Sequence, residues 1–488
     1  MGKCAVVVSS TCVVFGIGSL AVAFLLAYSG VLLTGGGTGY DTLMTQNREE
    51  QLKIQKRLME SFDPGSIRGH MVELTKTVHV SGTPEEEAVL KYVEDTWKSY
   101  GLETFTTDYQ VLLTFPDYNL PNTIAVNDNG NWVEISGGES VVLGPPEAAA
   151  QQNDPKGFAW WLAYSKDGAA TGRVVYANYG SIEDFDTLER LGVNLTNSIA
   201  LIRYGRVYRG NKAQEAQKRG AIGVIIYSDP YDYGFNMTEG SGFPDTVYRP
   251  PSGAERGTLN NVRGDPLTPL LPSKPYTFRS LTEDEARAGL YIPDVPVTPI
   301  GYGDAKKIFE RMQGTEAVPD GFKGGLKTPY RLTSGEVAFK LDVRSISDQR
   351  GKIQNVFGMV RGREEPDQLV MISNHIDAWT YGSIDPNSAS AVMMEMSRVL
   401  SKTVEETGWR PRRSILFCAW DAEEYNLVGS SEYVEEWVPL PSRTESLPDQ
   451  YLPALSGWPK LRSVQLGEGI SDDTVRQLLE QCPSLRQL

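Results

Sequence analysis

Acidic side chains and one histidine follow two apolar runs in the last third of the 488-residue chain. The runs are Leu369–Ile372 and Ile415–Trp420, and both are predicted to be buried strands. The side chains that follow them are His375 and Asp377 after the first run, and Asp421, Glu423 and Glu424 after the second. Ligand sites in open α/β sheets lie at the carboxyl ends of strands, so we expect these groups to form one site. Imidazole and carboxylate groups suit a divalent metal ion assisted by a general base.

The elements around these groups follow an α/β pattern. A helix is predicted at Ser388–Val404 between the two strands, with methionine and valine on the face that fills the core. Between about residues 157 and 302, short β-runs alternate with turn residues, as in GRVVYANYG, NSIALIRYG and AIGVIIYSDP. A helix at Lys212–Arg219 fits between the second and third runs, which predicts a strand–helix–strand unit in a separate β-rich domain.

Composition excludes some classes of function. The chain has 47 basic and 62 acidic residues and a formal net charge of −15, which argues against nucleic-acid binding. Cys4 and Cys12 lie in the N-terminal apolar stretch and Cys482 lies near the end, so the body of the chain has no disulfide framework. Bound ions and the hydrophobic core would have to stabilise an exported chain.

The stretch Cys4–Thr34 contains no charged residue. A bilayer requires about 20 apolar residues, whereas the apolar part of a signal peptide has about 7–15. We therefore favour an uncleaved transmembrane anchor over the alternative, a cleaved signal peptide. Lys3 is the only charged side chain before the stretch. This short basic end predicts a single-pass type II protein of the plasma membrane with its C-terminal part outside. Glycosylation patterns at Asn194 and Asn236 agree with this location.

The final fifty residues differ from the rest of the chain. Two similar motifs begin at Trp458 and Cys482, 24 positions apart, a spacing found in leucine-rich repeats. A C-terminal helix with leucines on one face explains the same residues, and both interpretations stay open.

Several motifs together identify a family. TKTVHVSGTPEE, RYGRVYRGNKAQEAQKRGAIGVIIYSDPYDY, HIDAWTYGSIDPNSA and GWRPRRSILFCAWDAEE resemble the glutamate carboxypeptidase II family of zinc peptidases, which includes the transferrin receptors. The resemblance implies a membrane-anchored zinc metallocarboxypeptidase that removes C-terminal, acidic residues from peptides. It implies a doubly wound peptidase domain with an inserted protease-associated domain, and a homodimer.

The resemblance assigns roles to the residues at the two strand ends. His375 is implied to bind one zinc ion and Glu424 the other, with Asp385 as the bridge between them. Glu423 corresponds to the general base, and Asp377 to a carboxylate that orients the imidazole of His375.

The resemblance also assigns residues outside the zinc site. Arg209 corresponds to the arginine that binds the C-terminal carboxylate of the substrate, but Thr258 replaces the asparagine that usually assists it, so the preference for glutamate is less firmly implied. A structural calcium site is implied, and its ligands are Thr268, Leu271 through its backbone, Glu432 and Glu435.

The resemblance stops after Trp437, and the expected organisation follows from this. The predicted parts are a membrane anchor at 1–35, a stem and the start of the peptidase domain at 36–114, the protease-associated domain at 115–350, the first half of the active site at 351–437, and an unrelated tail at 438–488. Two later zinc ligands and the dimerisation domain find no counterpart, so the sequence predicts an incomplete peptidase domain. A non-catalytic receptor or scaffold and a chimeric gene product are the alternative hypotheses.

Overall fold

The computed structural model describes residues 40–136, 138, 151, 153–234, 237–242, 249–277 and 280–437. The chain divides into two units, Met1–Phe62 and Asp63–Leu488. In the first unit, the described part contains the helix α2 (Tyr40–Glu60). No helix in the described ranges has the length and apolarity needed to cross a bilayer. The predicted anchor at Cys4–Thr34 and the predicted leucine-rich tail lie outside these ranges.

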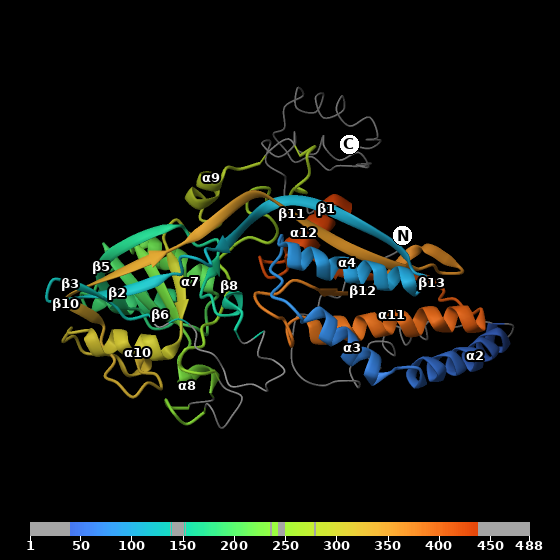
Figure 1. Ribbon diagram of the computed structural model, residues 1–488, viewed down its shortest axis with the longest axis horizontal. Coiled ribbons are helices and arrows are strands. Elements are labelled where there is room, and N and C mark those ends of the chain that lie inside the picture. The colour runs from blue at the N-terminus through green and yellow to red at the C-terminus, as the bar shows by residue number, and fades with distance from the viewer. Residues whose placement is uncertain are drawn as a thin grey trace. The chain divides into compact units, whose positions relative to one another are not determined.

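A four-stranded sheet in the second unit positions the candidate site (Figure 1). Its strand order is β1 (Glu103–Pro116), β11 (Ser345–Val360), β13 (Arg413–Trp420) and β12 (Glu365–His375). The first two ladders are antiparallel, and β12 and β13 pair in parallel. The sheet is therefore mixed. Of the parallel pairing expected for a doubly wound sheet, the described strands contain one pair, β12 and β13.

A helix joins the two parallel strands, as the sequence predicts. This helix is α11 (Asn387–Thr407), which ends at Gly408 in the left-handed conformation, with φ of 71°. Its Met393 and Met394 side chains are buried, which confirms that these methionines fill the core. A parallel pair requires such a crossover, because a short turn cannot return the chain to the same end of the sheet.

Helices cover both faces of this sheet. The helix α4 (Pro84–Ser99) packs on β1 and β11, where a Cβ atom at Gly358 would lie 2.9 Å from the ring of Trp97. On the opposite face Phe357 packs against Tyr433 of α12 (Val428–Trp437), with ring centroids 5.0 Å apart and the rings tilted by 36°. Successive strand residues point to opposite faces, so α4 and α12 enclose the centre of the sheet.

The strand β12 is not buried, contrary to the prediction from its apolar residues. Leu369, Val370 and Met371 are 47%, 46% and 44% exposed. Within the described residues β12 forms the edge of the sheet and pairs only with β13. An apolar run specifies a strand but not its neighbours, and here the neighbours leave the middle of the strand open. The prediction for Ile415–Trp420 is confirmed, because Leu416, Phe417 and Cys418 are at most 1% exposed.

A second, seven-stranded sheet holds the largest hydrophobic core. Its strand order is β3 (Asn131–Glu134), β2 (Thr123–Asp128), β10 (Thr333–Val343), β5 (Gly168–Tyr176), β6 (Ser198–Arg203), β7 (Gly223–Tyr227) and β9 (Val297–Ile300). The helices α6 (Ile182–Arg190) and α7 (Arg209–Lys218) connect β5, β6 and β7, which are parallel to one another. The predicted strand–helix–strand unit is therefore confirmed.

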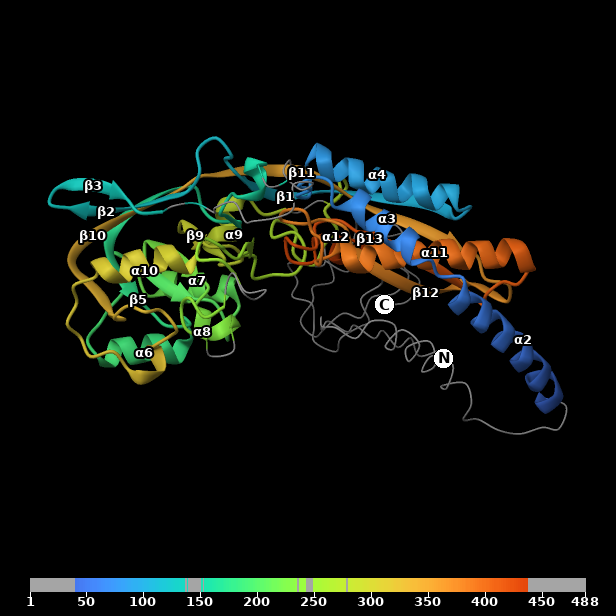
Figure 2. The same ribbon diagram turned by 60° about the horizontal axis from the view of Figure 1, so that its bottom comes forward.

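Shorter elements complete the second unit. They are α3 (Pro64–Leu74), α8 (Pro230–Tyr233), α9 (Glu283–Ala288), α10 (Tyr302–Arg311), the 3₁₀ turns at Pro155–Gly157 and Asp320–Phe322, and the two-residue strands β4 (Leu162–Ala163) and β8 (Gly257–Thr258). One residue, Arg344, separates β10 from β11, so a single extended segment passes from the larger sheet into the smaller one (Figure 2).

A matched pair of substitutions tests the exposure of β12. Met371 and Leu416 are opposite each other in the β12–β13 ladder, but Leu416 is only 1% exposed. We expect Met371→Ala to change the free energy of unfolding by less than about 0.5 kcal/mol, because little apolar surface returns to water. Leu416→Ala should cost about 2–5 kcal/mol, because it leaves a cavity in the core. Denaturant unfolding measures both, and equal losses would contradict the exposed position of β12.

Candidate metal and catalytic site

The ends of β12 and β13 bring the predicted site residues together. His375, the last residue of β12, pairs in register with Trp420, the last residue of β13. The ladder continues for one more hydrogen bond, from the amide of Ile376 to the carbonyl of Trp420 at 2.9 Å. The loops that follow the two strands therefore start side by side, as the sequence predicts.

The carboxylate of Asp377 connects these two loops. Its Oδ1 accepts a hydrogen bond from the amide of Glu423 at 2.9 Å, and its Oδ2 accepts one from the amide of Glu424 at 3.1 Å. The Nδ1 atom of His375 lies 3.4 Å from Oδ1 and 3.1 Å from the carbonyl oxygen of Asp377. Asp377 is 1% exposed, so its charge is stabilised by these donors rather than by water.

Two further carboxylates approach the other nitrogen of the imidazole. The Nε2 atom of His375 lies 3.0 Å from Oδ1 of Asp385 and 3.8 Å from Oε2 of Glu423. The side chain of Asp385 is 69% exposed, whereas that of Glu423 is 33% exposed. One nitrogen of His375 is thus held by Asp377, and the other faces the two residues that the sequence assigns to metal binding and proton transfer.

Burial and neighbouring charges shift the pKa values of these groups. Burial raises the pKa of Glu423 and raises that of Glu424 further, and the charge of Asp377 adds to both effects. Burial lowers the pKa of His375, but its interactions with Asp377 and Asp385 outweigh burial and raise it to about 11. In the absence of a metal ion the imidazole therefore carries a proton, and a metal ion has to compete with that proton.

The donor set fits zinc in kind but is short in number. Imidazole nitrogen and carboxylate oxygen are ordinary zinc ligands. Within the part of the chain that the structure describes, no group of three or more His, Cys, Asp or Glu side chains is arranged to hold a metal ion. The three expected ligands His375, Asp385 and Glu424 would give each of two zinc ions one terminal ligand and a shared bridge.

Two buried acids lie behind the site: Asp421, which the sequence analysis placed in the site without a specific role, and Glu86, which it did not single out. Burial and the nearby charge of Asp377 raise the pKa of Asp421 to about 7. Burial and the charge of Asp421 raise the pKa of Glu86 well above its usual value. Asn355 accepts a hydrogen bond from the amide of Asp421 at 3.1 Å and donates to the carbonyl of Gly429 at 2.9 Å. A signal for Glu86 was available, because an acidic residue on a helix face that also carries Val89, Leu90 and Val93 must be buried with them.

The other two histidines have structural roles. Nδ1 of His79 lies 2.7 Å from the carbonyl oxygen of Thr77, and its Nε2 lies 3.1 Å from the side-chain Nδ2 of Asn387. His70 lies between the hydroxyl groups of Tyr92 and Tyr100, at 2.8 and 3.0 Å. Both rings are therefore held by hydrogen bonds within the fold.

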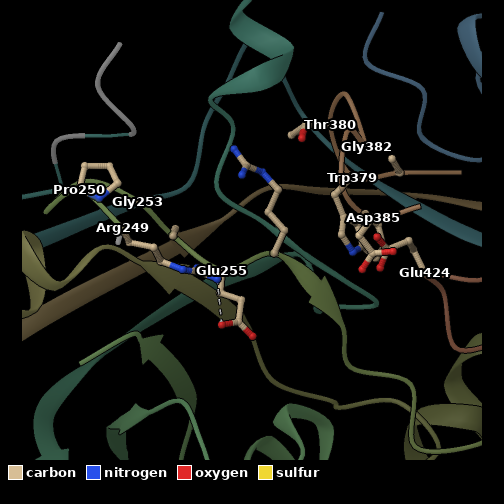
Figure 3. Close-up of a pocket in the computed structure, with 12 residues that line it drawn as sticks. Arg249, Pro250, Gly253, Glu255, Trp379, Thr380, Gly382, Asp385 and Glu424 are labelled. Atoms are coloured by element: carbon tan, nitrogen blue, oxygen red, sulfur yellow. Dashed lines mark hydrogen bonds and ion pairs between the residues drawn. The ribbon is translucent and has the colours of Figure 1, made fainter. Parts of the chain in front are cut away.

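A cavity of about 310 Å³ adjoins the site (Figure 3). Asp385 and Glu424 line it on the side of the four-stranded sheet, and Arg249, Glu255 and Arg256 line it on the side of the inserted domain. Arg209, the predicted binder of the substrate carboxylate, is not among the lining residues. Its guanidinium forms an ion pair with Glu255, with Nη2 3.0 Å from Oε1.

Three predicted calcium ligands, Thr268, Glu432 and Glu435, lie around Asp265, although the described residues contain no group of three or more His, Cys, Asp or Glu side chains arranged to hold a metal ion. Glu432 accepts hydrogen bonds from the amides of Asp265 at 3.0 Å and Ser273 at 2.5 Å, and Thr268 donates to Asp265 at 3.0 Å. Burial and the charge of Asp265 raise the pKa of Glu435 to about 8, and its Oε2 is buried without a hydrogen-bond partner among the described residues. Carboxylate and hydroxyl oxygens are the ligands that calcium prefers. Asp265 was missed by the sequence analysis, although it lies only three residues before Thr268.

The predicted glycosylation sites have different outcomes. Asn194 is exposed. Asn236 lies outside the described residues.

Comparison with known proteins identifies both domains. The profile of Peptidase family M28 matches residues 355–446, and that of the PA domain matches residues 170–261. A glutamate carboxypeptidase 2 homolog from Caenorhabditis elegans is 40% identical over 388 residues, which cover 78% of this chain and 50% of the relative. Aminopeptidase NAALADL1 from Rattus norvegicus is 37% identical over 415 residues, which cover 81% of this chain and 53% of the relative. The chain thus spans about half the length of these relatives, and the predicted resemblance is confirmed.

Among solved structures, an aminopeptidase from Aneurinibacillus sp. strain AM-1 is 20% identical, with a TM-score of 0.45, over 78% of this chain and 67% of that protein.

The role of Asp377 can be tested through stability. Asp377→Ala leaves the amides of Glu423 and Glu424 without an acceptor, so we expect the free energy of unfolding to fall by about 2–4 kcal/mol. Asp385→Ala is the control, because its exposed side chain bonds only His375 in the described contacts, and it should cost less than about 1 kcal/mol. Denaturant unfolding in the presence of a chelator provides the comparison. A smaller loss for Asp377→Ala than for Asp385→Ala would refute this role.

Proposed function

Since this chain is a homologue of the glutamate carboxypeptidase 2 family, with a PA domain and an M28 metallopeptidase domain, we propose that it carries part of a zinc-dependent exopeptidase centre. The observation that supports the proposal most strongly is the position of Asp377. One buried carboxylate fixes both the imidazole of His375 and the backbone of Glu423 and Glu424. A purely structural acid would not need to face a histidine and two glutamates at once.

The proposed chemistry is hydrolysis of a terminal peptide bond. His375, Asp385 and Glu424 would hold zinc, which when bound lowers the pKa of a water molecule and polarises a carbonyl group. Glu423 would act as the general base and accept a proton from water. Its pKa is raised by burial, which brings a carboxylate closer to the value suited to a general base near neutral pH. Asp377 holds the imidazole and the turn that carries Glu423 in fixed positions.

We propose removal of the C-terminal rather than the N-terminal residue. Relatives are named as both carboxypeptidases and aminopeptidases. Arg249 and Arg256 line the cavity opposite the metal-binding residues, and guanidinium groups bind a carboxylate rather than an ammonium group. Arg209, which the resemblance assigns to the C-terminal carboxylate itself, is paired with Glu255 and does not line the cavity. The preference for an acidic residue therefore stays a prediction.

A non-catalytic receptor or scaffold is the second candidate. The observation that favours it is the short donor set, because the described residues contain no group of three or more metal-binding side chains. On either reading we propose an extracellular location on the plasma membrane, supported by the uncharged stretch Cys4–Thr34 and the exposed Asn194. We also propose a structural calcium ion at Thr268, the carbonyl of Leu271, Glu432 and Glu435.

Zinc titration tests the proposed centre. We expect a polypeptide with this sequence to bind fewer than two zinc ions, weakly, and to show no measurable hydrolysis of dipeptides, because its donor set is incomplete. Binding should be lost in His375→Ala and Asp385→Asn, measured by calorimetry and metal analysis. Asp108→Asn is the control, because this exposed carboxylate lies on β1. Any hydrolysis that is detected should fall at least about 100-fold in Glu423→Gln.

Two results would count against the zinc proposal. Tight binding of two zinc ions would show that the donor set is complete. Zinc binding that is unchanged by both His375→Ala and Asp385→Asn would show that the metal lies elsewhere.

Calcium should stabilise the fold through the second cluster. At about 100 times its Kd, calcium should add about 2.7 kcal/mol to the free energy of unfolding. Glu435→Gln should abolish the gain, whereas Glu436→Gln should retain it, because Glu436 pairs with Tyr109 and Lys274 instead. Thermal unfolding with and without calcium measures the effect. A gain that persists in Glu435→Gln would remove this residue from the proposed site.

A further inference from the structure

The carboxylate of Glu255 forms ion pairs with two guanidinium groups beside the cavity. Oε1 of Glu255 accepts a hydrogen bond from Nη2 of Arg209 at 3.0 Å, and Oε2 accepts one from Nη2 of Arg249 at 3.2 Å. Both oxygens of Glu255 therefore face a positive charge. The three side chains together carry one net positive charge, and no further acid forms an ion pair with either arginine in the described contacts.

The guanidinium of Arg209 is tightly held. Its Cζ atom lies 5.6 Å from the ring centroid of Tyr204 and 5.8 Å from that of Tyr208. A Cβ atom at position 257 would lie 2.4 Å from Cζ, so only glycine leaves room for the guanidinium there. Nε of Arg209 is buried and has no hydrogen-bond partner among the described residues. An arginine held in this way, with an unused N–H group, is prepared to bind a further acceptor.

The position of Glu255 decides what the cavity offers to a ligand. Glu255 and Arg249 line the cavity, whereas Arg209 does not (Figure 3). A ligand carboxylate that binds Nη2 of Arg209 and Nη2 of Arg249 has to displace the carboxylate of Glu255, because Glu255 accepts hydrogen bonds from both atoms. The displaced carboxylate would lose two charge-assisted hydrogen bonds, which are stronger than hydrogen bonds between neutral groups.

We infer that Glu255 is a specificity-determining residue, an internal carboxylate that occupies the Arg209–Arg249 pair and disfavours ligands with an acidic C-terminal side chain. The inference rests on the proposed function in taking the cavity as the place where a peptide binds. Without the charge of Glu255, Arg209 and Arg249 form a site for a dicarboxylate. When Glu255 is charged, a ligand with a C-terminal glutamate gains no affinity over one with a C-terminal glutamine.

The test compares two dipeptides that differ only in this charge. Glycyl-L-glutamate and glycyl-L-glutamine are titrated into the purified full chain by calorimetry. In the native chain we expect their Kd values to differ by less than about threefold. In Glu255→Gln, glycyl-L-glutamate should bind at least about 10-fold more tightly than it binds the native chain, and the gain for glycyl-L-glutamine, which has one carboxylate instead of two, should be at least about threefold smaller. Arg209→Gln combined with Glu255→Gln should remove the gain.

Controls separate this role from structural support. Glu239→Gln alters a similarly exposed ion pair, with Lys306, that does not line the cavity, and it should leave both Kd values unchanged. The thermal unfolding midpoint of each variant shows whether it is folded. A Glu255→Gln chain that binds glycyl-L-glutamate no more tightly than the native chain overturns the inference, as does a gain that survives loss of Arg209. Neither zinc nor turnover enters the measurement, so its failure is distinct from failure of the proposed hydrolysis.

Discussion

A buried carboxylate needs donors on every side, and that requirement at Asp377 organises the peptidase part of this chain. The side chain is 1% exposed, so its negative charge is tolerable only with the amides of Glu423 and Glu424 and the imidazole of His375 around it. The end of β12 and the turn after β13 are thereby fixed to each other. These contacts lie within the protein, so they join the two loops directly to each other.

A second buried carboxylate accepts backbone hydrogen bonds where the inserted domain meets α12. Glu432 accepts hydrogen bonds from the amides of Asp265 and Ser273, and it lies 0% exposed. Burial raises the pKa of Asp265, and burial together with repulsion from neighbouring acids raises the pKa values of Glu432 and Glu435. A cation would relieve that repulsion. The two clusters show how charge, rather than apolar area alone, joins segments that are far apart in the sequence.

The sequence was sufficient to predict local structure and the groups at the strand ends. Apolar runs followed by acids located β13 and the turn with Glu423 and Glu424, and turn residues located the strand–helix–strand unit at β6–α7–β7. It was not sufficient to predict neighbours. The exposure of Met371 depends on which strand lies beside β12, and the pairing of Glu255 with Arg209 joins residues 46 positions apart across loops. The link between Asp265 and Glu432 spans 167 positions. Contacts of this kind depend on how the sheets pack, which residue type and periodicity do not encode.

The extended segment formed by β10 and β11 determines how the two sheets can move. β11 is paired with β1 as far as Ser345, and β10 is paired with β5 from Val343. Arg344 is the one residue between the two ladders, and its amide donates to Asn122 at 2.8 Å. A hinge at this point would have to break hydrogen bonds on both sides, whereas a paired ribbon can twist with all of them intact. The inserted domain is therefore joined to the peptidase sheet by a paired, continuous ribbon, and this connection favours twisting over bending at Arg344.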